Sequence, residues 1–156
     1  MKKYLLVIII LLLCSCGNKK EDLNSHEIKS DKYIVTLMFS KDADYVFNEV
    51  DDKYSFESEE LNIKGSLWLY NGNNYYKNKE GRSSKNTFVE DTFNKEYDGY
   101  RYQQTSKDME INILVGDEVL YFYVEPLDRS KSVDMDEIFK DKNFNNMLNS
   151  IEIKKL

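Results

Sequence analysis

Few residues in this chain could perform catalysis, and their types exclude most familiar mechanisms. His26 is the only histidine, and Cys14 and Cys16 are the only cysteines. A Ser–His–Asp triad would have to draw its base from His26, and a zinc site needs two or three His or Cys ligands. The sequence also lacks a Walker loop, a Gly-x-Gly-x-x-Gly run and a Gly-x-Ser-x-Gly elbow. We therefore expect a protein that is not an enzyme and that holds no metal and no cofactor.

Acidic residues are the remaining candidates for chemistry, because paired carboxylates can hydrolyse glycosidic bonds. The chain has 28 Asp and Glu, so pairs arise by chance and the sequence singles out none. The denser acidic segments are Asp42 with Asp44, Asp51-Asp52 with Glu57, and residues 128–136. None has the ligand spacing of a calcium loop, so we interpret them as solvated surface. A carboxylate-based hydrolase acting on envelope glycans remains the alternative function.

Aromatic residues form the one candidate binding surface. Trp68 and Tyr70 follow Asn62, Lys64 and Ser66 on the otherwise polar face of a predicted strand. Tyr75 and Tyr76 lie across a predicted hairpin, so the four aromatic side chains could form an exposed patch. Such a patch can stack on sugars or bind a protein partner. The alternative is that a helix covers this end of the sheet and buries Trp68.

The N-terminus has the features of an export signal. Residues 1–3 are Met-Lys-Lys, and residues 4–13 are an unbroken apolar run of ten. A membrane-spanning helix needs about 20 apolar residues, whereas the core of a signal peptide needs about 7–15. The run ends in Leu13, Cys14, Ser15, Cys16 and Gly17, which resembles the lipobox of bacterial lipoproteins.

The lipobox resemblance implies how the protein is processed and where it resides. Residues 1–15 would be the signal peptide, and the sulfur of Cys16 would carry diacylglycerol at the mature N-terminus. Two acyl chains hold a protein stably to a bilayer, whereas one chain does so only marginally. We expect a cell-membrane lipoprotein on the extracytoplasmic face, with the membrane as one partner through its diacylglyceryl anchor. An envelope protein or glycan is the other possible partner. Cys14 leaves with the signal, so the mature chain would have no disulfide.

Composition limits the remaining classes of partner. The chain has 156 residues and a net charge of −6; removing residues 1–15, which hold two Lys and no acid, gives −8. Nucleic acid is excluded as a partner, because phosphate binding needs a basic surface. The length fits one domain, and 12 Tyr and 8 Phe argue against disorder.

Composition also divides the exported part of the chain in two. Residues 17–32 are polar except for Leu23 and Ile28. We predict that residues 16–32 are the lipidated Cys and a flexible stalk, with His26 exposed to solvent. Residues 33–156 would then form the globular domain.

Periodicity predicts mainly strands in residues 33–124. The expected strands are 33–39, 53–57, 61–70, 97–104, 109–115 and 118–124. The Asn71-Gly72 pair predicts a tight hairpin with 75–77 as its return strand, and Gly116-Asp117 predicts another tight turn. Residues 78–86 read as a polar loop, and 87–96 fit either a short helix or an irregular crossing. Residues 118–124 are apolar on both faces, which predicts a central, doubly covered strand that Pro126 ends.

The C-terminal section is predicted to be helical. Two apolar stripes, at 135–139 and 144–151, are out of phase, so we expect two short helices with a break near 141–143 and a final strand at 150–153. The order of a strand at Gly99–Tyr102, a hairpin with Tyr121–Val124, and a helix in Met147–Ile153 resembles PsbP-like domains of small bacterial lipoproteins. That resemblance implies antiparallel sheets backed by helices and a role in binding or assembly. The predicted fold class is α+β: one domain, mainly antiparallel β-sheet, backed by a C-terminal helix.

Overall fold

The computed structural model describes residues 23–50 and 53–156. Its strands are β1 (Leu23–Lys29), β2 (Tyr33–Ser40), β3 (Val46–Val50), β4 (Lys53–Ser58), β5 (Ile63–Asn71), β6 (Val89–Phe93), β7 (Tyr97–Tyr102), β8 (Met109–Val115), β9 (Glu118–Pro126) and β10 (Glu152–Lys155). A 3-10 turn, η1 (Gly72–Asn74), precedes helix α2 (Tyr75–Arg82), and α3 (Met135–Lys140) and α4 (Lys142–Asn149) follow β9. The predicted signal peptide and Cys16 lie outside the described residues.

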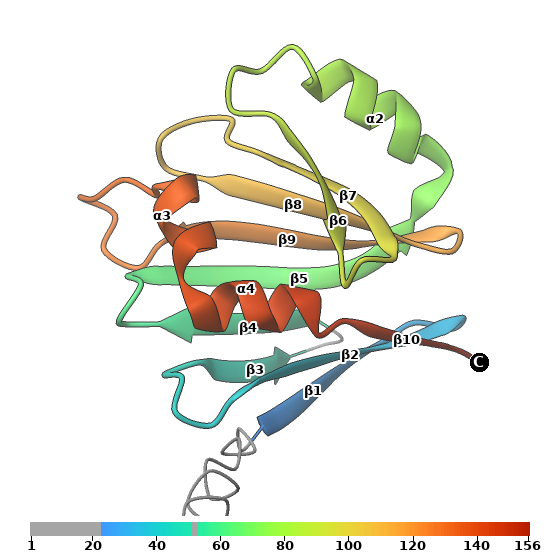
Figure 1. Ribbon diagram of the computed structural model, residues 1–156, viewed down its shortest axis with the longest axis horizontal. Coiled ribbons are helices and arrows are strands. Elements are labelled where there is room, and N and C mark those ends of the chain that lie inside the picture. The colour runs from blue at the N-terminus through green and yellow to red at the C-terminus, as the bar shows by residue number, and fades with distance from the viewer. Residues whose placement is uncertain (1–22, 51–52) are drawn as a thin grey trace, which may run out of the picture.

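The strands form two antiparallel sheets (Figure 1). The large sheet has seven strands in the order β3-β4-β5-β9-β8-β7-β6, and the small sheet has three in the order β1-β2-β10. Every pairing within both sheets is antiparallel. The predicted fold class, a single α+β domain of mainly antiparallel sheet with C-terminal helices behind it, is confirmed.

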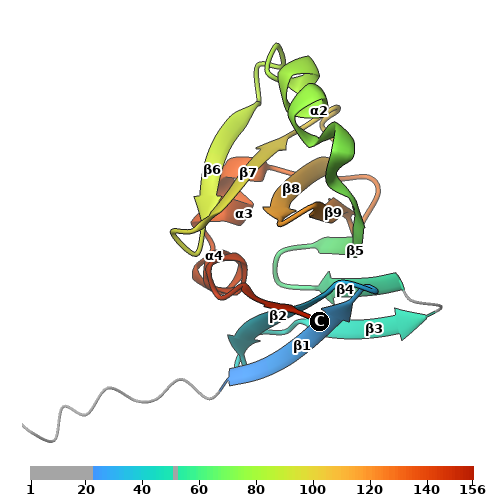
Figure 2. The ribbon, with the colours of Figure 1, turned by 90° about the vertical axis from the view of Figure 1, so that its right-hand side faces the viewer.

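The large sheet curves around α4, so it has a concave inner face and a convex outer face (Figure 2). Helices α3 and α4 lie on the inner side, and α2 lies on the outer side. The small sheet closes the rest of the inner side, with β2 packed against α4. The two faces of the large sheet therefore meet different surroundings.

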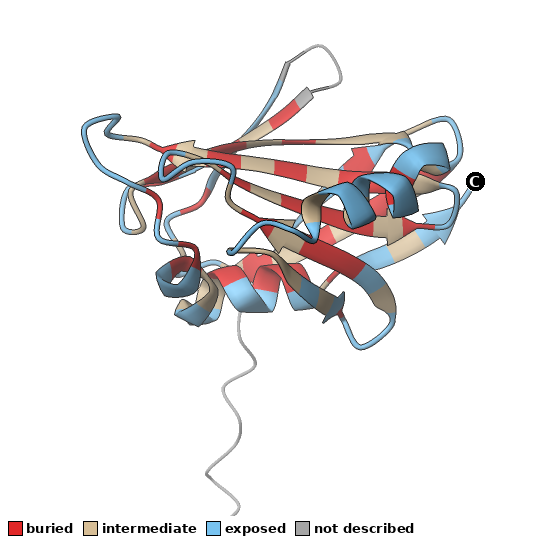
Figure 3. Ribbon diagram, turned by 90° about the horizontal axis from the view of Figure 1, so that it is seen from above, coloured by how far each residue is buried: buried red, intermediate tan, exposed pale blue. Residues whose placement is uncertain are grey.

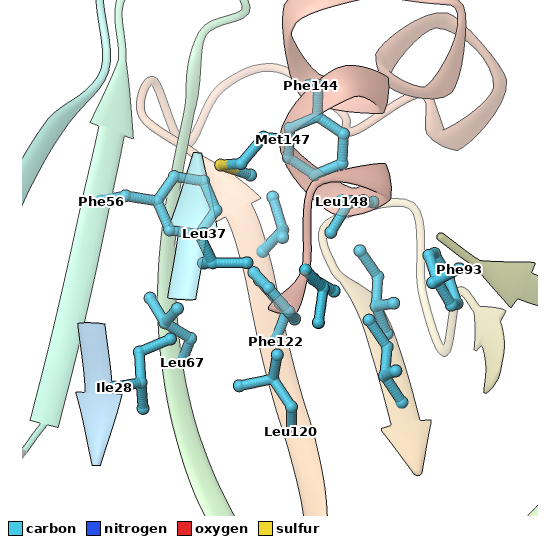
Figure 4. Close-up of a cluster of buried hydrophobic side chains, with 14 of the residues drawn as sticks. Ile28, Leu37, Phe56, Leu67, Phe93, Leu120, Phe122, Phe144, Met147 and Leu148 are labelled. Carbon is cyan, nitrogen blue, oxygen red and sulfur yellow. The ribbon is translucent and has the colours of Figure 1, made fainter. Parts of the chain in front are cut away.

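The main core lies between the inner face and these covering elements. Leu67 and Phe122 of the large sheet meet Leu37 of β2 and Phe144 of α4, and all four are fully buried (Figure 4). Each large apolar side chain buried in this way contributes about 1.5–3 kcal/mol. Helix α4 turns its buried side toward this core, whereas α2 is exposed along most of its length (Figure 3).

Strand β9 is the central strand of the large sheet, as its sequence predicts, but the predicted cover on both faces is wrong at Tyr121 and Tyr123, which are only half-buried on the outer face. It pairs with β5 on one side and with β8 on the other, so that Phe122 lies beside both Leu67 and Ile111. The predicted turn between β8 and β9 is also present. Gly116 has a φ of +62° there, and a side chain at this position would collide with the hydroxyl of Tyr33. Glycine suits this position because it has no Cβ, so it can adopt a positive φ and leaves room for the Tyr33 hydroxyl.

The predicted flexible stalk is wrong for residues 23–32. Residues 23–29 form β1, which pairs with β2 over its whole length, and Ile28 is fully buried in the main core. Ile28 supplies apolar burial that composition averaged over 17–32 does not reveal. His26 is half-buried instead of exposed: its ring stacks on Phe47 at 4.8 Å and meets the edge of Tyr54 at 5.3 Å. The domain therefore begins by residue 23, not at residue 33.

The predicted hairpin at Asn71-Gly72 is also wrong. Asn71 is extended, with φ −60° and ψ 124°, and its side chain caps η1 by accepting a hydrogen bond from the Asn73 N–H. Residues 75–77 are the first turn of α2 instead of a return strand, and the expected polar loop is helical as far as Arg82. The Gly72 N–H donates to the carbonyl of Asp117 at 2.8 Å, so the β8–β9 turn holds the end of β5. Strand β5 therefore pairs with β9 and β4.

The C-terminal helices match the prediction, and residues 87–96 do not. The break between α3 and α4 is the single residue Asp141, whose carboxylate accepts a hydrogen bond from the Phe144 N–H at 2.7 Å. Strand β10 follows as expected and pairs with β2. Residues 89–93, predicted as a short helix or irregular crossing, form the edge strand β6 beside β7.

Candidate binding face

The outer face of the large sheet carries a concentration of aromatic side chains. Directly opposed residues of antiparallel strands share a face, and the register pairs Trp68 with Tyr121, Tyr121 with Asn112, and Asn112 with Tyr100. The next row pairs Ser66 with Tyr123, Tyr123 with Glu110, and Glu110 with Tyr102. We call Trp68, Tyr121 and Tyr123 the aromatic strip; all three are half-buried.

The two central strands place the aromatic strip by simple alternation. In β9, Leu120, Phe122 and Val124 fill the inner core, and the residues between them point outward. In β5, Ile63 and Leu67 point inward, which turns Trp68 and Tyr70 outward. The strip is therefore built on the most firmly held strands of the domain, which suits a preorganised surface.

Trp68 and Tyr121 form the centre of the strip. Their ring centroids lie 4.6 Å apart, at an interplanar angle of 48°. Tyr70 meets Tyr121 edge-on at 6.1 Å, and its hydroxyl donates to Oδ1 of Asn112 at 3.1 Å. Burial raises the pKa of Tyr121, and the nearby Glu110 carboxylate raises it further. The Tyr121 hydroxyl thus stays protonated and acts as a donor toward the Glu110 carboxylate.

Helix α2 covers the other end of the outer face. Tyr75 is buried against Tyr100 at 5.4 Å, and the Arg82 guanidinium lies 5.1 Å from the centre of the Tyr102 ring. This second, smaller cluster includes Val119 and is separate from the main core. The cover stops short of Trp68, which remains half-buried.

The four predicted site residues therefore separate. Trp68 and Tyr70 share the outer face as expected. Tyr75 belongs to the layer under α2, so it is not an exposed contact. Tyr76 is 67% exposed and lies on α2, outside the aromatic strip. The alternative prediction is that a helix covers this end of the sheet and buries Trp68. Helix α2 does cover the end of the face at Tyr75, but Trp68 is only half-buried.

Several polar atoms beneath or beside α2 lack a hydrogen-bond partner among the described residues. These are the hydroxyls of Tyr75 and Tyr102 and Nδ2 of Asn112. Burial raises the pKa of Tyr102, with a further contribution from Glu110, so its hydroxyl stays neutral. Buried donors without partners are uncommon in folded proteins. The layer under α2 is therefore polar, and some of its hydrogen-bonding groups have no partner among the described residues.

A small polar pocket adjoins the aromatic strip on the side away from α2. Its volume is about 150 Å³, and it is lined by Ser55, Phe56, Glu57, Lys64, Gly65, Ser66, Tyr123 and Glu125. The Lys64 ammonium and the Glu125 carboxylate form an ion pair at 3.1 Å. The hydroxyls of Ser55 and Ser66 form no hydrogen bond with any other side chain that the structure describes. The pocket therefore combines the Tyr123 ring, two serine hydroxyls without a side-chain partner among the described residues and two carboxylates, one of which is paired with Lys64.

The carboxyl groups with shifted pKa values lie elsewhere. Burial would raise the pKa of Asp44, but hydrogen bonds from the Glu60 N–H and the Ser58 hydroxyl outweigh it and lower the pKa. The pKa of Asp117 is lowered by Lys32, and that of Asp128 by Ser130. A general acid needs the opposite shift. Within the described part of the chain, no three His, Cys, Asp or Glu residues are arranged to hold a metal ion.

Most of the outer face is not predictable from the sequence. The apolar run of 118–124 predicts that Tyr121 and Tyr123 lie on a doubly covered strand, and no sequence pattern singles out Glu110 or Asn112. Alternation alone places Tyr121 and Tyr123 on one face of β9, but only the pairing of β9 with β5 brings them beside Trp68 and Ser66. The missing signal was strand order, which one sequence does not contain.

Comparison with known protein families, curated proteins and solved structures found no match for this chain. The resemblance to PsbP-like domains thus stays a prediction. Over residues 23–50 and 53–156, no helix combines the length and the apolar character that crossing a membrane requires.

Proposed function

We propose that this protein is a non-catalytic binding or assembly module, exported and held by lipid on the extracytoplasmic face of the cell membrane. The observation that carries the binding role is the aromatic strip, which stays partly exposed on the central strands β5 and β9. Aromatic residues with a polar tip are enriched where proteins bind partners, because they bury much area and still donate hydrogen bonds. An envelope protein or glycan is the proposed partner.

The lipid anchor is proposed from the lipobox that ends at Cys16. The domain begins by Leu23, seven residues after Cys16. Seven residues reach at most about 25 Å even when fully extended. A diacylglyceryl group on Cys16 would therefore hold the domain close to the membrane surface and restrict it to partners in that zone.

The anchor is tested with a Cys16→Ala variant. Without the thiol, diacylglycerol cannot be attached and the lipoprotein pathway cannot cut the signal. The variant is expected to run at the unprocessed mass and to lose the mature form from the detergent phase. A Cys14→Ala variant is the matched control and is expected to mature normally. Recovery of Cys16→Ala in the detergent phase at the mature mass would contradict the lipoprotein proposal.

The binding role is tested by crosslinking in intact cells, followed by capture of the full-length chain through a C-terminal tag. Trp68→Ala and Tyr121→Ala are expected to reduce the captured partner by roughly tenfold, the effect of about 1.4 kcal/mol at one hot-spot residue. Tyr76→Ala, on the exposed side of α2, is the control and is expected to capture as much as wild type. Equal capture by all the variants would remove the aromatic strip as the binding surface.

A carboxylate-based hydrolase acting on envelope glycans is the second candidate. It draws support from Glu57 and Glu125, which line the same pocket beside the aromatic strip. In such an enzyme the two carboxylates would flank the scissile bond as acid and base or nucleophile. Release of reducing sugar ends from isolated envelope glycan, abolished in both Glu57→Gln and Glu125→Gln, would favour this candidate over the binding module.

A further inference from the structure

We infer that the polar pocket beside the aromatic strip binds one uncharged sugar ring of a glycan chain. This inference rests on the proposed binding role of the outer face and names the class of ligand. The pocket is bounded by Tyr123 on β9, by Ser55 and Glu57 on β4, and by Lys64 and Ser66 on β5. It lies on the outer face, opposite the main core.

The pocket's size selects a small ring. Its volume is about 150 Å³, and cavities of roughly that size are known to admit a single benzene ring. Sites for drug-sized ligands and cofactors are larger, at about 300–1,000 Å³. A single pyranose ring suits a cavity of about 150 Å³, so the pocket can hold one sugar unit of a longer glycan.

The pocket's lining suits a polyhydroxylated ligand. Ser55 and Ser66 supply hydroxyls that bond no other described side chain, and Glu57 and Glu125 supply acceptors for sugar hydroxyls. Tyr123 supplies a half-buried ring on which the apolar face of a sugar can stack. An apolar side chain or acyl chain would instead leave these polar groups buried without partners, which is costly.

The charges in the pocket favour an uncharged sugar over an anionic one. Lys64 is the one cationic residue lining the pocket, and its ammonium is already paired with Glu125 at 3.1 Å. Arg129, whose guanidinium lies 3.9 Å from Glu125, also faces this carboxylate. Glu57 adds a further negative charge. A phosphate or uronate would meet the Glu57 carboxylate, whereas Lys64 and Arg129 both already face Glu125.

The aromatic strip continues the site along the strands. Tyr123 and Tyr121 are two residues apart on β9, as are Ser66 and Trp68 on β5. Two residues of a strand span about 7 Å, so the pocket and the Trp68–Tyr121 pair follow one another along the same line. A glycan with one ring in the pocket can therefore place a neighbouring ring on Trp68.

The test uses the full chain purified in a detergent that carries no sugar headgroup. Chitotetraose and maltotetraose are the uncharged probes, and tetragalacturonate is the anionic probe. Binding is followed by calorimetry and by the fluorescence of Trp68, the only tryptophan in the chain. At least one uncharged probe is expected to bind and to change Trp68 fluorescence, whereas tetragalacturonate is expected to bind more weakly than either.

Variants assign the binding to the pocket. Tyr123→Ala is expected to weaken binding by roughly tenfold, because it removes one stacked ring. Tyr123→Phe keeps the ring and is expected to retain most of the affinity, and Ser66→Ala gives an independent probe of the pocket. Tyr76→Ala, outside the site, is the control for fold and is expected to bind as wild type does.

Three results would overturn the inference: binding of neither uncharged probe, tighter binding of tetragalacturonate, or binding that Tyr123→Ala and Ser66→Ala leave unchanged. These outcomes are separable from failure of the proposed function. If Trp68→Ala still loses its partner in intact cells while no saccharide binds, the outer face recognises a protein and only the sugar inference fails.

Discussion

The Tyr75 hydroxyl is buried beneath α2 without a hydrogen-bond partner among the described residues. A buried polar group that lacks a partner costs roughly 1–3 kcal/mol of stability. Tyr75→Phe removes the hydroxyl and keeps the ring against Tyr100, so we predict that it raises the free energy of unfolding by about 1 kcal/mol. Tyr76→Phe, at the exposed neighbouring position, is expected to change nothing. Urea unfolding measures both, and a loss of stability in Tyr75→Phe would show that its hydroxyl is bonded.

His26 is the residue through which pH should act on the attachment of β1. Burial among Phe47 and Tyr54 lowers its pKa below the usual 6.5, although Glu49 on β3 opposes the shift. The unfolded chain then binds more protons than the folded one just below pH 6.5, so stability falls as pH falls through this range. We predict that His26→Phe, which keeps a ring against Phe47 and Tyr54, reduces the loss of stability between pH 7.5 and 5.5.

The measurement for His26 is a series of thermal melts across that pH range, with wild type and His26→Phe compared at each pH. Glu27 and Lys29 follow His26 on β1 and pair with each other at 3.0 Å. Carboxyl groups titrate at lower pH and are common to both proteins, so the difference between the two curves isolates His26. A difference that stays constant with pH would show that His26 does not titrate differently in the folded state.

At the scale of elements, α2 is the least firmly held part of the outer face. Tyr75 is its only buried residue, and Gly81 interrupts its last turn. A Cβ at Gly81 would meet nothing within 4 Å, so Gly81→Ala is predicted to stabilise the helix by about 0.5–1 kcal/mol. Gly72→Ala should do the opposite, because its Cβ would lie 2.9 Å from the Asp117 carbonyl oxygen. Helical circular dichroism and thermal melts compare the two, and a stabilising Gly72→Ala would contradict the close packing of η1 on the β8–β9 turn.

Elements with a strong local signal were predictable, and those fixed by distant contacts were not. The alternation of 109–115 predicted β8, the run of 118–124 that is apolar on both faces predicted β9, and Gly116-Asp117 predicted the turn between them. Asn71-Gly72 carries an equally strong hairpin signal. No hairpin forms there, because Asn71 caps η1 and the Gly72 N–H donates a hydrogen bond to the Asp117 carbonyl. That bond joins residues far apart in the sequence, so a local pattern does not reveal it.

At the scale of the whole molecule, the large sheet separates stability from recognition. Its inner face is closed by α4 and by the small sheet, which includes the unpredicted β1. Helix α2 covers only one end of its outer face, and the aromatic strip and the polar pocket lie beyond that cover. The sequence predicted the inner core from apolar periodicity. It predicted two of the outer aromatics, Trp68 and Tyr70, but the pocket needs β4, β5 and β9 side by side.

Adjacent residues of β9 allow this separation to be tested, since Phe122 points into the core and Tyr121 points to the outer face. Phe122 is fully buried, so Phe122→Ala is predicted to cost about 3–5 kcal/mol and to lower the melting temperature sharply. Tyr121 is half-buried, so Tyr121→Ala should cost clearly less and leave a folded protein. Partner capture from intact cells should nevertheless fall in Tyr121→Ala, because Trp68 loses the ring 4.6 Å away. Thermal melts and capture of the full-length variants show whether the outer face serves binding or is packed like the core. Equal destabilisation by both substitutions would mean that the outer face is as closely packed as the core, and it would argue against a binding surface there.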